Sequence, residues 1–215
     1  MIKEAILSLL VLCTLAPAKP FEYFIPHRYY TVELPKNVIT IKYPIPPAWF
    51  NKRLLAYINK ECVKHGVPIL LVHKVIELES QWHQNSPSPN FDRHHNVISI
   101  DYNLMQVNSE NLARFAHAYK EPGRTEKSYD AIHNPYDNVH FGICYLRDLY
   151  DQLGSWQEAT AAYNGGTRRV INGTLKDCTK DYVHVVCPVE NWWLTIPTNY
   201  VCLVGNQDFL QQKTE

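Results

Sequence analysis

Glu79 is the residue of this chain that is best placed for acid–base chemistry. It follows the largely apolar segment 69–78, which has the composition of a buried helix, and it stands at the C-terminal end of that helix. There the helix dipole and low-dielectric surroundings disfavour a negative charge, so a carboxylic acid stays protonated near neutral pH and can protonate a leaving group. The alternative, a solvated glutamate at a helix end, is more common for such a residue taken alone. Glu77 points in another direction on the same helix and serves as a comparison.

Three further short motifs carry polar or aromatic side chains and follow Glu79-Ser80 in chain order: Leu104-Met105-Gln106-Val107-Asn108, Ala161-Ala162-Tyr163-Asn164-Gly165-Gly166 and Thr198-Asn199-Tyr200-Val201. Each motif alone is common and has a structural interpretation. Met105 can fill a core, Tyr163 can be a buried aromatic with a bonded hydroxyl, and Asn164 can cap a helix before glycine. The four motifs together are more specific than any one of them.

In this order and spacing, the motifs resemble the catalytic domain of the soluble lytic transglycosylase family, a bacterial relative of goose-type lysozyme. The stretch from Asn134-Pro135 to Tyr145-Leu146 also matches, and the resemblance covers roughly residues 51–205. It implies a mainly α, lysozyme-like (transglycosylase) domain that acts on the glycan strands of peptidoglycan.

The resemblance also implies roles for single residues. Glu79 corresponds to the single catalytic acid that protonates the glycosidic oxygen between N-acetylmuramic acid and N-acetylglucosamine. Six residues correspond to substrate-binding positions: Ser80, Met105, Gln106, Tyr163, Asn164 and Tyr200. Neither a metal nor a cofactor is implied.

One carboxylate suffices in this chemistry, whereas most glycosidases use two. The N-acetyl oxygen of the substrate stabilises the positive centre, and the acid, now a base, takes the proton of the C6 hydroxyl, which closes onto C1 as a 1,6-anhydro sugar. Two alternatives remain open. Asp101 can activate water, which gives a hydrolytic lysozyme-type muramidase, or it can merely cap a turn. The chain can also be a catalytically silent peptidoglycan-binding or scaffold protein.

Three departures from the family pattern concern the backbone and the loops. Asn103 stands where the family usually has glycine, and asparagine is the next best residue for a positive φ. Gly165 replaces the more usual alanine. Residues 174–197 form a longer insertion than expected, and Trp192 and Trp193 within it either stack on sugar rings or pack in the core.

The elements that must position these residues are mainly helices. The apolar spacing, the capping residues and the helix breakers predict six helices. These are expected at 51–66, 68–80, about 109–116, 135–154, from 155 onward and at 198–209, and a Ser155–Glu158 capping box begins the fifth. Residues 81–103 have turn signals and predict a long loop.

The first 50 residues differ in composition from the rest. Residues 1–18 have the layout of a secretory signal peptide, the alternative being a buried first helix. Residues 19–50 are rich in proline and predict an N-terminal extension with one or two short strands or an extended arm. The main domain is therefore expected at residues 51–215. Export indicates the periplasm or cell envelope of a bacterium.

The composition and the residue spacing limit the kinds of molecule that this protein is expected to bind. Lys plus Arg and Asp plus Glu each total 21, so the basic excess of a nucleic-acid-binding protein is missing. The apolar run at 5–16 is shorter than the roughly 20 residues that span a bilayer. The histidines have no zinc-ligand spacing, and those considered are His83, His94, His95 and His133. Export favours a Cys178–Cys187 disulfide, the alternative being reduced, buried thiols.

Overall fold

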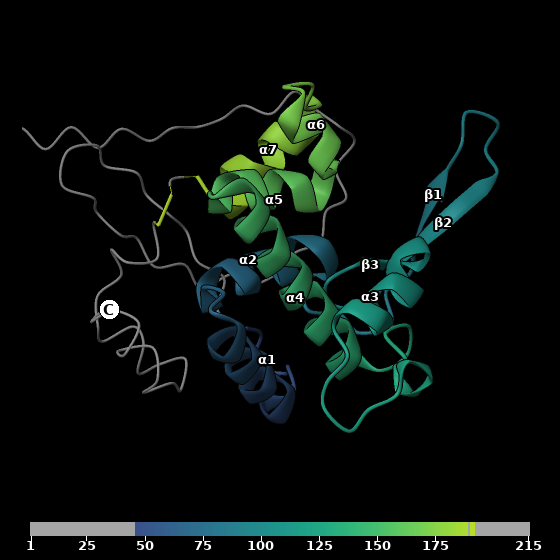
Figure 1. The fold of residues 1–215 in the computed structure, drawn as a ribbon, viewed down its shortest axis with the longest axis vertical. Helices are drawn as coiled ribbons and strands as arrows, with labels where there is room; N and C mark the ends of the chain where they lie inside the picture. The colour runs from purple at the N-terminus through teal and green to yellow at the C-terminus, as the bar shows by residue number, and fades with distance from the viewer. Residues whose placement is uncertain (1–45, 189, 192–215) are drawn as a thin grey trace, which may run out of the picture. The chain divides into compact units, whose positions relative to one another are not determined.

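The protein is mainly helical, as predicted, in the computed structural model, which describes residues 46–188, 190 and 191 (Figure 1). Its helices are α1 (Lys52–His65), α2 (Ile69–Ser80), α3 (Leu112–Ala118), α4 (Pro135–Leu153), α5 (Trp156–Gly165), α6 (Thr167–Ile171) and α7 (Asp177–Val186), with 3-10 turns η1 (Ser109–Asn111) and η2 (Glu126–Ser128). Several predictions lie outside the described residues: the signal peptide at 1–18, most of the extension at 19–50, Trp192, Trp193, Tyr200 and the helix at 198–209. Within the described part, no helix is both long and apolar enough to cross a membrane.

Local capping sets the helix ends where the sequence predicted them. The Asn51 side chain accepts hydrogen bonds from the backbone N–H groups of Arg53 and Leu54, which starts α1, and Gly66 ends it with φ 63°. Pro135 occupies the first turn of α4, and Gly154 ends that helix with φ 78°. These helices therefore begin and end for reasons contained within a few residues of sequence.

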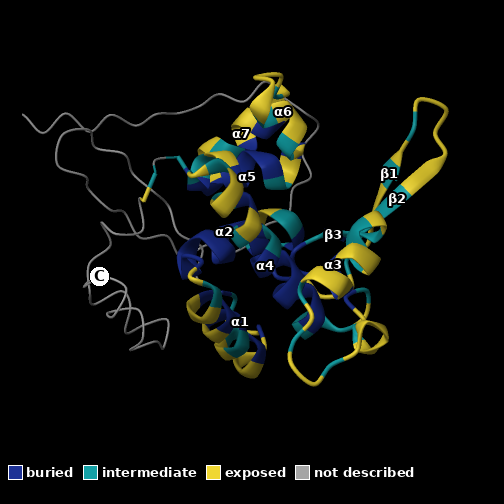
Figure 2. Cartoon of the chain, viewed as in Figure 1, coloured by how far each residue is buried: buried dark blue, intermediate teal, exposed yellow. Residues whose placement is uncertain are grey.

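The core forms where α4 packs against α1 and α5, and α2 lies within it (Figure 2). Every residue from Ile69 to Ile76 is buried, so α2 has no solvent-facing side over most of its length. His73 is among them, and its Nε2 donates to the Asn59 side chain of α1 over 2.9 Å. The last turn of α2, which carries Glu79, is thus held on a rigid, buried support.

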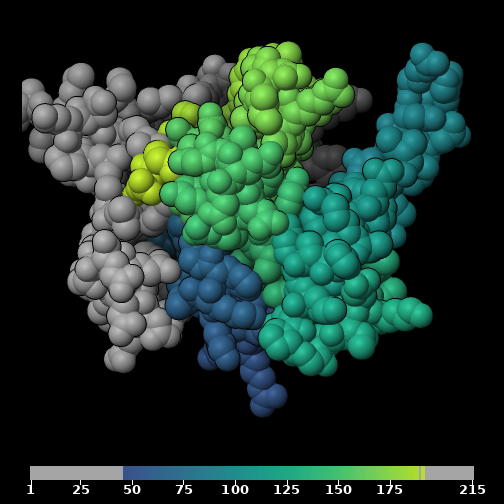
Figure 3. Space-filling model, viewed as in Figure 1, coloured from purple at the N-terminus to yellow at the C-terminus, as the bar shows by residue number. Residues whose placement is uncertain are grey.

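The prediction of a long loop at 81–103 is wrong, because this segment contains two strands of a small sheet. The sheet is antiparallel with the order β1 (Ser88–Phe91), β2 (Val97–Tyr102), β3 (Val107–Asn108). The β1–β2 hairpin projects from the helical body (Figures 1 and 3), and Phe91, Val97 and Ile98 are all more than half exposed. The hairpin has no buried face, so the alternation that identifies a half-buried strand is absent from its sequence.

The predicted Cys178–Cys187 disulfide is also wrong. The segment between the two cysteines is α7, so they lie at opposite ends of a helix. Nine residues at a helical rise span about 14 Å, whereas the Cα atoms of a disulfide are at most about 7 Å apart. Cys178 is a free, exposed thiol. The sequence analysis did not predict a helix within the insertion at 174–197, and this helix keeps the two cysteines too far apart for a disulfide.

Candidate active site

Glu79 lies in the last turn of α2, and its partner is a tyrosine from α7. The Tyr182 hydroxyl donates to Glu79 Oε1 over 2.7 Å, although 103 residues separate the two in sequence. Burial raises the pKa of Glu79 to about 7; the hydrogen bond from Tyr182 opposes that shift, and the negative charge of Asp101 adds to it. A large part of the Glu79 side chains in solution at neutral pH therefore carries a transferable proton.

Tyr182 is a site residue that the sequence analysis missed. It belongs to the 174–197 insertion, has 7% of its surface exposed, and is preceded by no recognisable motif. Burial and the nearby Glu79 raise the pKa of the Tyr182 phenol well above its usual value. The phenol consequently stays protonated and acts as a hydrogen-bond donor to Glu79. The only sequence signal was an insertion of unusual length.

The turn that links β2 to β3 carries the Leu-Met-Gln motif. Asn103 has φ 62° and is fully buried, its Oδ1 accepts from Leu104 N, and its Nδ2 donates to the Ile132 carbonyl. Asparagine thus adopts the left-handed backbone expected of glycine here and adds two hydrogen bonds. The turn survives the departure from the family pattern, and it is closely packed.

Met105 has a packing role and offers no side-chain surface to a ligand. Its exposed fraction is 0%, and its backbone N–H donates to Asn138 Oδ1 on α4 over 2.9 Å. A Cβ added at Gly142 would lie 2.5 Å from Met105 Sδ, so only glycine allows this close approach. The Met105 carbonyl accepts from the Tyr163 hydroxyl over 2.7 Å. The structure therefore favours the core-filling interpretation of Met105.

Tyr163 and Asn164 connect α5 to two other parts of the site. Tyr163 reaches the Leu-Met-Gln turn, as above, and lies close enough to Glu79 for that charge to contribute to its raised pKa. Asn164 is exposed, and its Oδ1 accepts from the buried Thr179 hydroxyl of α7 over 2.9 Å. The helix cap is Gly166 and not Asn164, since α5 extends to Gly165. The predicted Tyr-Asn pair thus ties the turn, α5 and α7 together.

Ser80 and Gln106 lie beside these residues, and their polar groups bond to the protein backbone. Ser80 is 5% exposed, and its hydroxyl donates to the Ile76 carbonyl. Gln106 Nε2 donates to the carbonyls of Ser86 and Asn103 over 2.6 and 2.8 Å, which pins the loop after α2 to the turn. Substrate contact by either side chain stays a prediction.

Asp101 lies in β2 and does not cap a turn. The simpler interpretation, a turn-capping aspartate, is therefore wrong. Its two carboxylate oxygens accept from Asn108 Nδ2 of β3 over 2.7 Å and from Asn90 Nδ2 of β1 over 2.8 Å. The carboxylate therefore joins all three strands. It is also close enough to Glu79 for its charge to raise the pKa of that residue.

The loop directly after Glu79 is held in an uncommon backbone conformation. Gln81 and Trp82 have φ of 52° and 67°, values that few non-glycine residues adopt. Trp82 is 2% exposed, and its ring packs edge-on against Phe50 with centroids 4.9 Å apart. Packing thus stabilises the strained turn, a feature that is frequent at functional sites.

Two groups of side chains in the described residues have the composition and spacing to hold a metal ion, and both lie on other elements. One is His65, His140 and Cys144, and the other is Glu61, Glu121 and His140. None of the four histidines considered from the sequence belongs to either group. The first group combines α1 with α4, and the second adds Glu121 from the segment between α3 and η2, so no single stretch of sequence contains either set.

Comparisons with known proteins agree with the motifs. The pattern of the transglycosylase SLT domain family matches residues 56–185. A "Putative peptidoglycan-binding-like protein" of Escherichia coli K12 is 27% identical over 96 residues, which are 45% of this chain and 58% of the relative. A "Peptidoglycan-binding-like protein" of Escherichia coli O157:H7 is also 27% identical over 96 residues, which are 55% of that relative. The chain therefore matches a little over half the length of these curated relatives.

Two solved structures are also similar, with lower sequence identity. The lytic transglycosylase Slt of Pseudomonas aeruginosa, solved as an inactive mutant, has a TM-score of 0.47 and 21% identity over 61% of this chain and 22% of that one. The 70 kDa soluble lytic transglycosylase of Escherichia coli has a TM-score of 0.43 and 18% identity over 65% of this chain and 21% of that one.

Proposed function

This chain belongs to the transglycosylase SLT domain family, and from this premise we propose that it is a peptidoglycan lytic transglycosylase. It cleaves the β-1,4 bond between N-acetylmuramic acid and N-acetylglucosamine and leaves a 1,6-anhydro end. Glu79 is its catalytic acid and base. The observation that carries this proposal is the half-buried Glu79 carboxyl at the end of α2, whose pKa is raised to about 7 and which the Tyr182 phenol holds in place.

In the first step, protonated Glu79 donates its proton to the glycosidic oxygen. The bond from C1 to that oxygen breaks, the N-acetylglucosamine side leaves as an alcohol, and the acetamido oxygen of the muramic residue stabilises the positive charge at C1. A carboxyl with a pKa near the working pH is suited to this role, because it is both protonated and acidic enough to transfer the proton. Tyr182 fixes the orientation of the carboxyl.

In the second step, the Glu79 carboxylate takes the proton of the C6 hydroxyl. The C6 oxygen then bonds to C1 and the acetamido oxygen is released, so the enzyme regains its proton and no water is consumed. The same residue acts in both steps, which accounts for a site with one carboxyl in a desolvated position. Positioned acid–base groups supply roughly a hundred- to ten-thousand-fold in rate.

The hydrolytic alternative needs a second carboxylate that binds water, and Asp101 is the nearby candidate. Both of its oxygens accept from amide groups of the neighbouring strands, so the residue is engaged in joining the sheet. This supports transglycosylation over hydrolysis. The third possibility, a silent binding protein, agrees with the names of the two Escherichia coli relatives but gives no reason for a proton donor at Glu79.

Digestion of purified cell walls, followed by mass spectrometry of the released muropeptides, tests the proposal. We expect anhydro ends. Reducing ends would make the protein a hydrolase, and the absence of products together with retention on the wall would make it a binding protein. Because the substrate is peptidoglycan, we further propose that the protein is exported to the cell envelope, which fractionation of the producing bacterium checks.

A further inference from the structure

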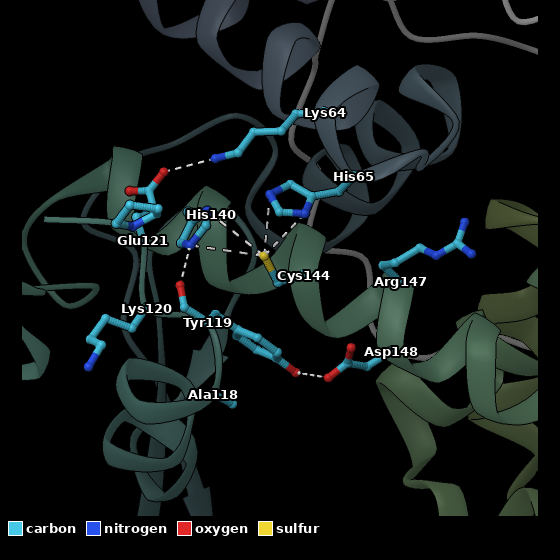
Figure 4. A pocket seen from close by; sticks show the side chains of 11 residues that line it. Lys64, His65, Ala118, Tyr119, Lys120, Glu121, His140, Cys144, Arg147 and Asp148 are labelled. Carbon is cyan, nitrogen blue, oxygen red and sulfur yellow. Dashed lines mark hydrogen bonds and ion pairs between the residues drawn. The ribbon is translucent and has the colours of Figure 1, made fainter. Parts of the chain in front are cut away.

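Two pairs of side chains meet between α1 and α4, on elements that do not carry Glu79. Glu61 and His65 are four residues apart on α1, and His140 and Cys144 are four residues apart on α4. Residues with this spacing project from one side of a helix, and α1 packs against α4, so the pairs face each other. Figure 4 shows the Cys144 sulfur between the rings of His65 and His140.

The separations of these atoms match those of ligands around one zinc ion. Cys144 Sγ is 3.6 Å from His65 Nε2 and 3.8 Å from His140 Nδ1. In a tetrahedral site with ordinary Zn–S and Zn–N bond lengths, sulfur and nitrogen ligands are about 3.6 Å apart. One ligand atom from each of these three residues lies within 4.8 Å of the other two. Small side-chain movements would complete the coordination.

The surroundings of His140 have the form of a metal ligand's outer shell. Its Nε2 lies 2.8 Å from the backbone carbonyl of Tyr119, which can only accept, so this nitrogen carries a proton. Its Nδ1 is then directed at the Cys144 sulfur and at Glu61 Oε2, which is 2.8 Å away. Metal-ligating histidines usually donate their second N–H to a carbonyl or carboxylate in this way, which sets the ring orientation.

A surface pocket leads to the cluster. Its volume is about 280 Å³, and its lining includes Lys64, His65, Tyr119, His140, Cys144 and Arg147 (Figure 4). Cys144 is 6% exposed and lies on the pocket wall. An ion can therefore enter without opening of the fold, and a water molecule from the pocket can take a fourth position.

We propose that His65, His140 and Cys144 bind one Zn²⁺ ion, with the fourth position open to the pocket. The nitrogen lone pairs of His65 and His140 and the Cys144 thiolate form the three bonds, the protons displaced from those nitrogens and from the thiol pass to solvent, and no group is oxidised or reduced. A set of two imidazoles and one thiolate selects zinc over magnesium or calcium, which prefer oxygen ligands. The ion would bridge α1 and α4 and stabilise the folded state.

The test is zinc titration of the reduced full-length protein after removal of metals with a chelator. We expect one Zn²⁺ per chain, a rise in melting temperature that Mg²⁺ does not reproduce, and a thiolate-to-metal absorption band when Co²⁺ replaces Zn²⁺. Cys144→Ser should weaken zinc binding by at least about 100-fold, the upper end of the loss for outer-shell changes. Cys178→Ser, at an exposed thiol of α7, should bind like the wild type.

Loss of binding in Cys178→Ser with retention in Cys144→Ser would overturn the proposal, as would a cobalt complex without a thiolate band. The wild-type cobalt spectrum needs no variant, so a folding defect of Cys144→Ser cannot hide the answer. Glu79→Gln should bind zinc unchanged, which separates this site from the proposed catalytic one.

Discussion

Three features determine the pKa of Glu79: burial, the hydrogen bond from the Tyr182 hydroxyl and the charge of Asp101. Burial prevails and raises the pKa to about 7, so a large fraction of the carboxyls is protonated at neutral pH. Glu77 lies two residues earlier on the same helix, but its Oε2 pairs with Lys74 Nζ at 3.2 Å. The two glutamates therefore have different chemistry although both precede the same strained turn.

Glu79→Gln should keep the fold and abolish nearly all turnover, because the amide keeps the shape of the side chain but has no transferable acidic proton. We expect a loss of about a hundred- to ten-thousand-fold in the rate of muropeptide release. Glu77→Gln is the matched control and should retain turnover, with a small loss of stability from its pair with Lys74. A silent Glu79→Gln and a damaging Glu77→Gln would reverse the assignment of the acid.

Asp101→Asn should leave anhydro products and a near-normal maximal rate. Asparagine can keep the hydrogen bonds to Asn90 and Asn108 by rotation of their amides, but it removes the negative charge that raises the pKa of Glu79. The alkaline limb of kcat/KM, which falls as Glu79 loses its proton, should therefore move to lower pH. A loss of two or more orders of magnitude at every pH would instead indicate that Asp101 activates water.

At the scale of elements, the site depends on helices and a turn that hold each other by a few close contacts. Residues 177–186 of the insertion fold as α7, which brings Tyr182 to the end of α2 and Thr179 to Asn164. The Leu-Met-Gln turn is held against α4 by Asn138 and by the missing side chain of Gly142. Changes within these elements should thus alter the site without touching Glu79.

Tyr182→Phe should move the alkaline limb of the pH profile to higher pH, opposite to Asp101→Asn. The hydrogen bond from the Tyr182 hydroxyl lowers the pKa of Glu79, so its removal lets that pKa rise. The phenylalanine ring still occupies the space of the tyrosine ring. A pH series of kcat/KM measures this. Tyr150→Phe, which keeps the stacking of that ring on Trp156, is the control and should show the wild-type profile. A Tyr182→Phe profile without the shift would contradict the positioning role.

Gly142→Ala should destabilise the protein by about 1–3 kcal/mol and reduce turnover, because the new methyl group overlaps Met105 and displaces the turn. Gly154→Ala provides the contrast: a Cβ there meets nothing within 4 Å, and its cost of about 1 kcal/mol comes from φ 78° alone. Chemical denaturation and muropeptide release measure both. Equal activity losses in the two variants would show that overlap with Met105 is not the cause.

At the scale of the whole molecule, the half-buried Glu79 makes the free energy of unfolding depend on pH. The folded-state pKa of Glu79 is about 7 and the ordinary value is 4.5. Below the ordinary value both states hold the proton, so burial of the carboxyl carries no ionic penalty. As the pH rises from there to the folded-state pKa, the carboxyl of the unfolded chain ionises while the folded protein still holds its proton. Stability is therefore lost until the folded protein ionises as well.

Glu79→Gln should therefore become more stable than the wild type as the pH rises, by about 1–3 kcal/mol above neutral pH, and the difference should nearly vanish in acid. Denaturant unfolding of both proteins across this range measures it. Glu77→Gln should lack the pH-dependent gain. A constant difference between Glu79→Gln and the wild type would mean that Glu79 has an ordinary pKa in the folded protein.

The sequence by itself determined the features that rest on neighbours along the chain. Asn51, Gly66, Pro135 and Gly154 act through backbone groups within one helical turn, so the helix ends could be predicted from them. The apolar run before Glu79 predicted a buried helix with an acid at its end. The motifs in their order also predicted the family, which the match over residues 56–185 confirms.

Only the tertiary structure decided which distant groups meet. Tyr182 reaches Glu79 across 103 residues, Met105 packs into the space left by Gly142, and Cys144 lies between two histidines of different helices. The hairpin escaped prediction because it has no buried face, and the disulfide failed because a helix separates its two cysteines. Such contacts depend on how helices pack, and packing joins residues whose separation along the chain leaves no periodic or local signal.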